Sequence, residues 1–282
     1  MEIGIFARTF SRKSLAEVLD AVAASGLRLV HFNLSCAGLP SLPVALSRSD
    51  ALSIQAEFNE RGLRMVGVSG TCNLIHPDLL KRREGLLRVA QLATACASLG
   101  TNLISLCTGT RDPENMWRHH PENQSAAAWN DLRSSLLELL DRTGETGVRF
   151  GIEPERANVV NSAERARLLL DEIGSSRIKI ILDPANLLVP EDFPRQEQIV
   201  AKAFQILAPE IATVHAKDID SAGVHVSAGR GVLNYRHFFQ CLRLHAPQSP
   251  VILHELEETD VPRAVRFLRE TASERSSERT YA

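Results

Sequence analysis

Residues 178–187 read IKIILDPANL, a run of strand-forming residues that leads into an aspartate, a proline and an amide. Three other stretches also place a metal-capable residue after a β-rich run: VRFGIEPE (148–155), IATVHAKD (211–218) and PVILHELE (250–257). Successive stretches lie about 30 to 40 residues apart, which is room each time for a loop, a helix and a return strand. Four consecutive parallel strands would therefore bring their polar ends to one rim.

The same alternation of strand and helix runs through the chain of 282 residues. β-rich runs recur at 2–7, 29–34, 65–70, 102–109, 148–154, 178–184, 211–218 and 250–256. Helix-period segments follow them at 14–24, 50–61, 78–99, 123–146, 162–173, 196–208, 235–246 and 260–271. Eight such units predict a single α/β domain over residues 1–272, a (β/α)8 TIM barrel with a parallel eight-stranded core. The tail at 273–282, SERSSERTYA, lacks apolar residues for packing, and we expect it to be disordered.

Local signals support these boundaries. Ser162 is expected to open a helix that Gly174 ends. Two connections exceed the length usual in this fold class: CTGTRDPENMWRHHPE (107–122) and DPANLLVPEDFPRQ (183–196). Long loops that leave the functional rim are candidate walls of a substrate pocket.

Composition excludes several classes of partner. The formal net charge of −2 gives no general attraction for nucleic acid or anionic membranes, and no segment approaches a membrane span. Arg8, Arg12 and Lys13 stand where a secretory signal needs an apolar run, so we expect a cytoplasmic protein. The five cysteines are odd in number and widely spaced, which favours reduced thiols over disulfides or a structural zinc site.

The four rim stretches suggest a site for one divalent metal ion, with Glu153, Asp183, His215 and Glu255 as ligands. Three carboxylates and one imidazole make a mostly oxygen site. Such a donor set suits Mn2+ first, with Mg2+, Co2+ or Zn2+ as alternatives. Each residue taken singly could also be a rim ion pair or a hydrogen-bonded core histidine, but four equivalent strand ends argue for a shared site.

The barrel with GIEP, LDPANL, HAKD and a final glutamate resembles the xylose-isomerase-like TIM-barrel superfamily, in particular its sugar (phosphate) isomerase and epimerase branch. The segments at 32–35, 73–88, 106–123 and 229–235 are similar to segments of this branch. The resemblance implies a metal-dependent isomerase or epimerase of a sugar or keto-polyol that abstracts a proton next to a carbonyl through a metal-stabilised enediolate. It also implies that Glu153 and Glu255 are the acid/base pair, with Asp183 and His215 chiefly ligands.

Further residues are candidates for contact with a small carbohydrate substrate. Lys217 and Arg230 could hold substrate oxygens or pair with rim acids, and His76 could face substrate or cap a helix. Trp117, His119 and Asn186 lie on the two long loops and are expected to set substrate choice. Ketose 3-epimerases usually carry a histidine at the position of Asn186 and a glutamate at that of Val159, and these departures argue against tagatose-type or psicose-type specificity.

Three other functions stay open at this point. The same enediolate collapses by β-elimination when a leaving group is present, so a lyase or dehydratase of a keto-inositol or 3-keto-glycoside is the main alternative. A DNA-repair endonuclease of this superfamily would need additional zinc ligands, where the chain has Ser69 or Gly70, Cys107 or Thr108, and Asn186. A non-catalytic sugar sensor is disfavoured by the complete acid/base pair. Barrels of this branch are often dimers or tetramers, which leaves a homo-oligomer open.

Overall fold

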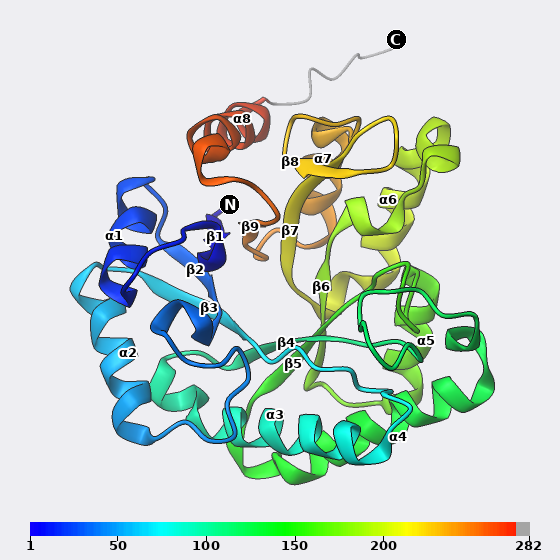
Figure 1. The fold of residues 1–282 in the computed structure, drawn as a ribbon. Coiled ribbons are helices and arrows are strands. Elements are labelled where there is room, and N and C mark those ends of the chain that lie inside the picture. Colours follow the sequence, from blue (N-terminus) through cyan, green and yellow to red (C-terminus); the bar gives the residue numbers. More distant parts are fainter. Residues whose placement is uncertain (275–282) are drawn as a thin grey trace.

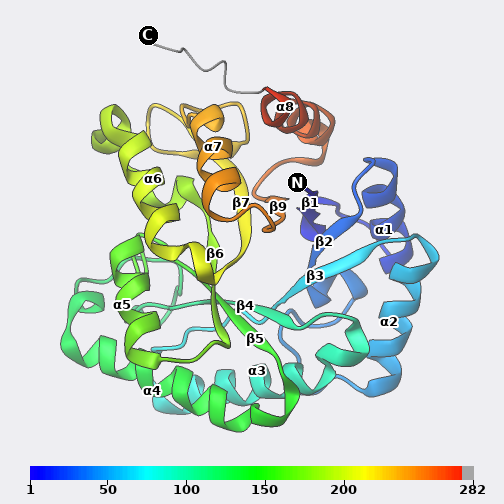
Figure 2. The same cartoon turned by 180° about the vertical axis from the view of Figure 1, so that it is seen from behind.

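The centre of the molecule is a closed barrel of parallel strands, seen from two sides in Figure 1 and Figure 2. The computed structural model describes residues 1–274. The barrel strands are β1 (Ile3–Phe6), β2 (Leu29–Phe32), β3 (Arg64–Ser69), β4 (Leu103–Cys107), β5 (Arg149–Glu153), β6 (Ile178–Leu182), β7 (Ile211–Ile219) and β9 (Val251–Leu253). Neighbours pair in parallel from β1 to β7, and β9 joins β7 to β1, which closes the sheet. The predicted (β/α)8 fold is confirmed.

Eight α-helices surround the barrel within the described residues. They are α1 (Leu15–Ala24), α2 (Arg48–Glu60), α3 (Leu79–Leu99), α4 (Ala126–Arg142), α5 (Ala163–Ile173), α6 (Gln196–Leu207), α7 (Tyr235–His245) and α8 (Val261–Ser273). The side chain of Ser162 accepts a hydrogen bond from the backbone N–H of Arg165, and Gly174 ends α5 in a left-handed conformation, as expected. Most of the predicted tail, residues 275–282, lies outside the described residues, whereas Ser273 still belongs to α8.

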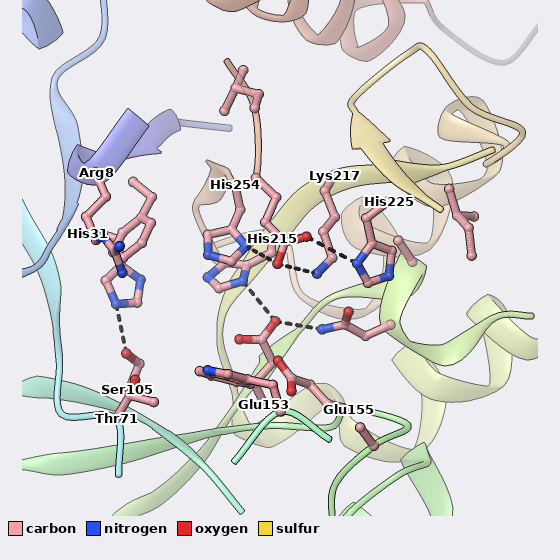
Figure 3. A pocket seen from close by; sticks show the side chains of 18 of the residues that line it. Arg8, His31, Thr71, Ser105, Glu153, Glu155, His215, Lys217, His225 and His254 are labelled. Atoms are coloured by element: carbon pink, nitrogen blue, oxygen red, sulfur yellow. Dashed lines mark hydrogen bonds and ion pairs between the residues drawn. The ribbon is translucent and has the colours of Figure 1, made fainter. Parts of the chain in front are cut away.

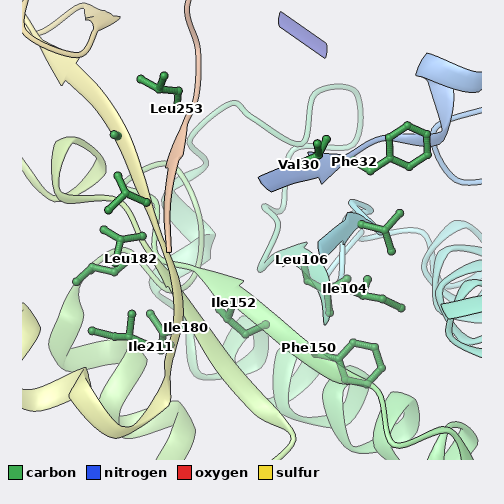
Figure 4. Packing of buried hydrophobic residues seen from close by; sticks show 14 of the residues in the cluster. Val30, Phe32, Ile104, Leu106, Phe150, Ile152, Ile180, Leu182, Ile211 and Leu253 are labelled. Atoms are coloured by element: carbon green, nitrogen blue, oxygen red, sulfur yellow. The ribbon is translucent and has the colours of Figure 1, made fainter. Parts of the chain in front are cut away.

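Branched and aromatic side chains from the strands pack together as the core (Figure 4). Ile152, Ile180 and Leu253 are at most 1% exposed. The barrel also needs a residue without a side chain on β1. A Cβ atom on Gly4 would lie 2.5 Å from the carbonyl oxygen of Leu29 and 2.8 Å from Cδ1 of Ile252, so the two neighbouring strands approach β1 too closely for alanine.

A ninth strand, β8 (His225–Ser227), was not predicted. β7 runs on beyond the barrel, and β8 folds back on it in antiparallel register, with Ile219 opposite His225. The buried carboxylate of Asp218 anchors the segment that follows, because it accepts hydrogen bonds from the backbone N–H groups of Gly229 and Leu233. This hairpin brings His225 to the rim of the barrel.

The long loop after β4 is tied to its neighbours by the side-chain amides of three asparagines. Asn73 donates to the carbonyl oxygen of Thr110 at 2.8 Å, and Asn123 donates to that of Ala157 at 2.8 Å. Asn158 accepts from the backbone N–H of Gly109 at 2.6 Å. The loops after β3, β4 and β5 therefore form one connected wall at the functional rim. Among residues 1–274, no helix combines the length and the apolar character needed to cross a membrane.

Candidate active site

A cavity of about 940 Å³ opens at the carboxyl ends of the barrel strands. Most strands contribute to its lining, and the residues at or near their carboxyl ends are Phe6, His31, Ser69, Ser105, Glu153, His215, Lys217 and His254. Figure 3 shows the imidazoles of His215 and His254 at its centre, with Glu153 and Glu155 on one side and Lys217 and His225 on another. The cavity thus lies where TIM barrels place their catalytic groups.

Asp183, His215 and His254 form a cluster that could hold a metal ion. Asp183 directly follows β6, His215 lies within β7, and His254 directly follows β9. One potential ligand atom from each lies within 4.8 Å of the others. Asp183 Oδ2, His215 Nε2 and His254 Nδ1 are all buried without a hydrogen-bond partner among the described residues. Buried polar atoms without hydrogen-bond partners are rare, and one metal ion could satisfy all three of these atoms.

Glu153 holds one of these imidazoles in place. Its Oε1 accepts a hydrogen bond from Nδ1 of His215 at 3.1 Å and another from Nδ2 of Asn186 at 2.8 Å. Burial alone would raise the pKa of Glu153, but the adjacent charges of His215, His254 and Lys217 lower it below its ordinary value. An ionised Glu153 fixes the tautomer of His215 that leaves the Nε2 lone pair free.

Glu255 has a different environment from the cluster. Its Oε1 lies 3.1 Å from Nζ of Lys217, and its Oε2 accepts a hydrogen bond from Nδ1 of His225 at 3.1 Å. Burial alone would raise the pKa of Glu255, whereas the hydrogen bond from His225 and the charge of Lys217 lower it. The predicted fourth ligand therefore lies on the wall of the same cavity with Lys217 and His225 as partners, and its Oε1 is 3.9 Å from Nδ1 of His254.

Lys217 is a buried ammonium group with 1% of its side chain exposed. Its Nζ lies 3.6 Å from Oδ2 of Asp183 and 3.1 Å from Oε1 of Glu255. Burial lowers the pKa of a lysine, but the surrounding carboxylates, chiefly Asp183, raise the pKa of Lys217 above its ordinary value. The charged lysine thus links the metal-capable cluster to the cavity wall.

The structure divides the other predicted substrate residues into two groups. Trp117, Asn186 and Lys217 line the cavity. His76, His119 and Arg230 do not belong to its lining. His76 Nε2 lies 3.2 Å from the carbonyl oxygen of Pro113 while its Nδ1 accepts from the backbone N–H of Asp78. Arg230 pairs with Asp260 at 2.9 Å, and His119 lies exposed on its loop.

Several cavity residues were missed by sequence reasoning. His254 directly follows a β-rich run, as Asp183 does, and this position at a strand end could have identified it as a candidate ligand. Glu155 faces the cavity beside Glu153, and burial together with the charge of Glu153 raises the pKa of Glu155 to about 8. His31 lies in the middle of a predicted strand, and its Nε2 is 2.9 Å from Oγ of Ser105.

The sequence matches the family described as Xylose isomerase-like TIM barrel over residues 19–271. The chain therefore belongs to this family, which agrees with the resemblance drawn from its strand-end motifs. No curated protein sequence matches it significantly.

Solved structures share the fold over almost the whole chain. The apo form of 3-keto-D-glucoside 4-epimerase from E. coli has a TM-score of 0.76 at 18% identity, covering 96% of this chain and 99% of that chain. D-psicose 3-epimerase with D-tagatose from Clostridium cellulolyticum H10 has a TM-score of 0.75 at 16% identity, covering 96% and 99%. L-ribulose 3-epimerase has a TM-score of 0.73 at 17% identity, covering 96% and 95%. At these identities the likeness shows the architecture alone.

Proposed function

We propose that this protein is a divalent-metal-dependent isomerase or epimerase of a sugar or keto-polyol. The observation that carries the proposal is the set of three buried ligand atoms without a hydrogen-bond partner, on Asp183, His215 and His254. They lie in a cavity large enough for a monosaccharide-sized molecule, at the catalytic rim of the barrel. The family and the epimerases that share its fold support the choice of a carbohydrate substrate.

A divalent cation bound there would supply stabilisation of the negative charge that develops on substrate oxygens when a neighbouring C–H loses its proton. Glu153 is the proposed proton acceptor, because its carboxylate lines the cavity beside the cluster and is held ionised. Asn186 fixes this carboxylate from one side and His215 from another. Because both hydrogen bonds fall on Oε1, Oε2 is the oxygen of Glu153 that would accept the substrate proton.

The second group of the proposed acid/base pair is Glu255. It lies on the cavity wall with Lys217 and His225 as partners, so protons could be exchanged with these neighbours rather than with the cluster. Epimerisation needs one proton carrier on each face of the substrate carbon. Glu153 and Glu255 come from β5 and from the segment after β9, and they supply two such carriers from separate parts of the wall.

One observation favours a lyase as the second candidate. Of the two proposed carriers, only Glu153 contacts the metal-capable cluster directly by a hydrogen bond, whereas the carboxylate of Glu255 is already engaged by Lys217 and His225. A single base is enough for β-elimination from a keto-inositol or a 3-keto-glycoside. The two candidates share the first proton abstraction and differ in the fate of the resulting carbanion.

The deciding experiment is an NMR time course in D2O. Protein stripped with a chelator and reloaded with a single metal would be incubated with ketoses, keto-inositols and 3-keto-glycosides. Deuterium entering a recovered or inverted carbon supports the isomerase or epimerase, and release of a leaving group supports the lyase. Absence of both from every substrate, in protein shown to hold metal, would contradict the proposed function.

A further inference from the structure

The end of β9 offers two adjacent groups that could bind a metal, and the structure separates them. His254 directly follows the strand and belongs to the cluster with Asp183 and His215. Glu255 comes next, and its carboxylate contacts Lys217 and His225 at 3.1 Å each. Its Oε1 also lies 3.9 Å from Nδ1 of His254, but Glu255 does not belong to the cluster. Figure 3 shows the imidazole of His254 beside that of His215, while dashed lines join Lys217 and His225 to the neighbouring carboxylate.

The backbone explains this separation. Glu255 has a φ of 50°, and among residues 1–274 it is the one residue other than glycine with a positive φ. This left-handed conformation is unfavourable for a glutamate and persists only where surrounding contacts enforce it. Here it breaks the alternation of side chains at the end of the strand. The contacts of Glu255 with Lys217 and His225 hold the turn that leaves His254 in the cluster.

His254 is also fixed by its ring contacts. Its imidazole stacks on that of His215 with ring centroids 4.6 Å apart and an interplanar angle of 23°. Phe6 lies against it, with ring centroids 5.1 Å apart. The His254 ring is therefore held at the strand end with Nδ1 buried, and this atom has no hydrogen-bond partner among the described residues. Such an orientation is what a metal ligand requires.

From this geometry we infer that His254, and not Glu255, is the metal ligand contributed by β9, and that its imidazole shifts the metal preference away from Mn2+ and Mg2+. The inference rests on the proposed metal-dependent function. Two imidazoles and one carboxylate favour borderline transition metals such as Co2+, Zn2+ and Fe2+ more than an oxygen-rich set does. Glu255 then belongs to the substrate-facing wall with Lys217.

The test measures metal affinity without substrate. Chelator-stripped protein would be titrated with Co2+ and with Mn2+, for wild type, His254→Ala, His254→Glu and Glu255→Gln. We expect His254→Ala to weaken Co2+ binding by more than about 100-fold, beyond the loss expected for a group that only orients a ligand. Glu255→Gln should weaken it by less than about 10-fold. His254→Glu should lower the ratio of Mn2+ to Co2+ dissociation constants at least about 10-fold, because it restores an oxygen donor.

A spectroscopic measurement on the unaltered protein covers the case in which a His254 variant fails to fold. Cu2+ bound at the cluster should show nitrogen superhyperfine splitting from two imidazoles in its electron paramagnetic resonance spectrum. Splitting from one nitrogen, or a larger loss of affinity in Glu255→Gln than in His254→Ala, would overturn the inference. Full metal binding with no deuterium exchange in any sugar would leave the ligand assignment standing and reject only the proposed function.

Discussion

Glu153 and His215 meet above the strand that separates them, with Oε1 of the glutamate 3.1 Å from Nδ1 of the histidine. The two residues come from β5 and β7, and Asp183, which follows the intervening strand β6, completes this side of the site. The hydrogen bond gives Glu153 two separable tasks: it orients the imidazole, and its ionised carboxylate is available to a substrate proton. Substitutions of different size should separate the tasks.

Glu153→Gln should abolish proton transfer while keeping most of the metal affinity. The amide oxygen can still accept from His215, but glutamine cannot take a proton, so turnover should fall by about 10²- to 10⁴-fold. Glu153→Ala removes the orienting bond as well and should weaken metal binding by roughly 10- to 100-fold. Deuterium exchange and metal titration of both variants check this, with exposed Glu145→Gln as the control. A much larger metal loss in Glu153→Ala would make Glu153 a direct ligand, as the sequence predicted.

Asn186 should affect both rate and substrate binding, because its Nδ2 donates to the same carboxylate oxygen at 2.8 Å. Asn186→Ala leaves this oxygen with one hydrogen bond fewer and should lower kcat and raise KM while metal content stays full. Asn186→Asp places a second carboxylate against Glu153 and should be the more damaging change. Both variants would be measured by steady-state kinetics and metal analysis. Wild-type kinetics in both variants would show that Asn186 has no role in the reaction.

The fold was predictable because the pattern of a β-rich run followed by a helix-period segment is repeated eight times. Each of the eight barrel strands was expected within a few residues of its observed position, since a buried parallel strand reads as a continuous apolar run. The site was predictable where a single polar residue marks the strand end, as Asp183 does. At the end of β9, His254 and Glu255 are adjacent candidate ligands. The positive φ of Glu255 determines where the two side chains point, and a glutamate in the sequence gives no sign of this backbone conformation.

Trp117 and His119 make a matched pair on the long loop after β4. Both were expected to contact substrate, but Trp117 lines the cavity and His119 does not. The indole is 52% exposed, so it can cover a sugar ring without being required by the core. Once a substrate is known, Trp117→Ala should raise KM several-fold and His119→Ala should leave it unchanged. Equal effects of the two substitutions would argue against this division of the loop.

Asp260 should make the free energy of unfolding depend on pH in the acidic range. Its carboxylate accepts hydrogen bonds from Arg263 and Arg230 and from the hydroxyl of Ser227, which ties the β8 segment to the start of α8. The hydrogen bonds from Arg263 and Arg230 lower the pKa of Asp260 well below its ordinary value. A depressed folded pKa stabilises the protein above the unfolded pKa, about 3.9, and the stabilisation is lost as pH falls below that value.

Asp260→Asn should therefore lower the free energy of unfolding by about 1–3 kcal/mol at neutral pH. The difference from wild type should shrink as pH falls below about 4, because Asp260 of the unfolded wild-type chain then binds a proton that the folded carboxylate, with its lowered pKa, does not. Urea unfolding of both proteins between pH 3 and 7 measures it. The exposed control Asp171→Asn removes a surface ion pair with Arg167 and should cost less. A constant difference across the whole pH range would contradict the assignment to ionised Asp260.

Gly4 should be irreplaceable for a steric reason that does not involve a turn. It lies in β1 between β2 and β9, where an added Cβ would come within 2.6 Å of Cβ of Leu29 as well as close to the Leu29 carbonyl oxygen. Backbone atoms cannot move aside as a flexible side chain can, so Gly4→Ala should destabilise the protein by about 1–3 kcal/mol or more. Gly144→Ala is the matched control, because nothing lies within 4 Å of its added Cβ. Equal unfolding midpoints for the two variants would mean that β1 can shift outward, and the cavity wall at Phe6 would have to shift with it.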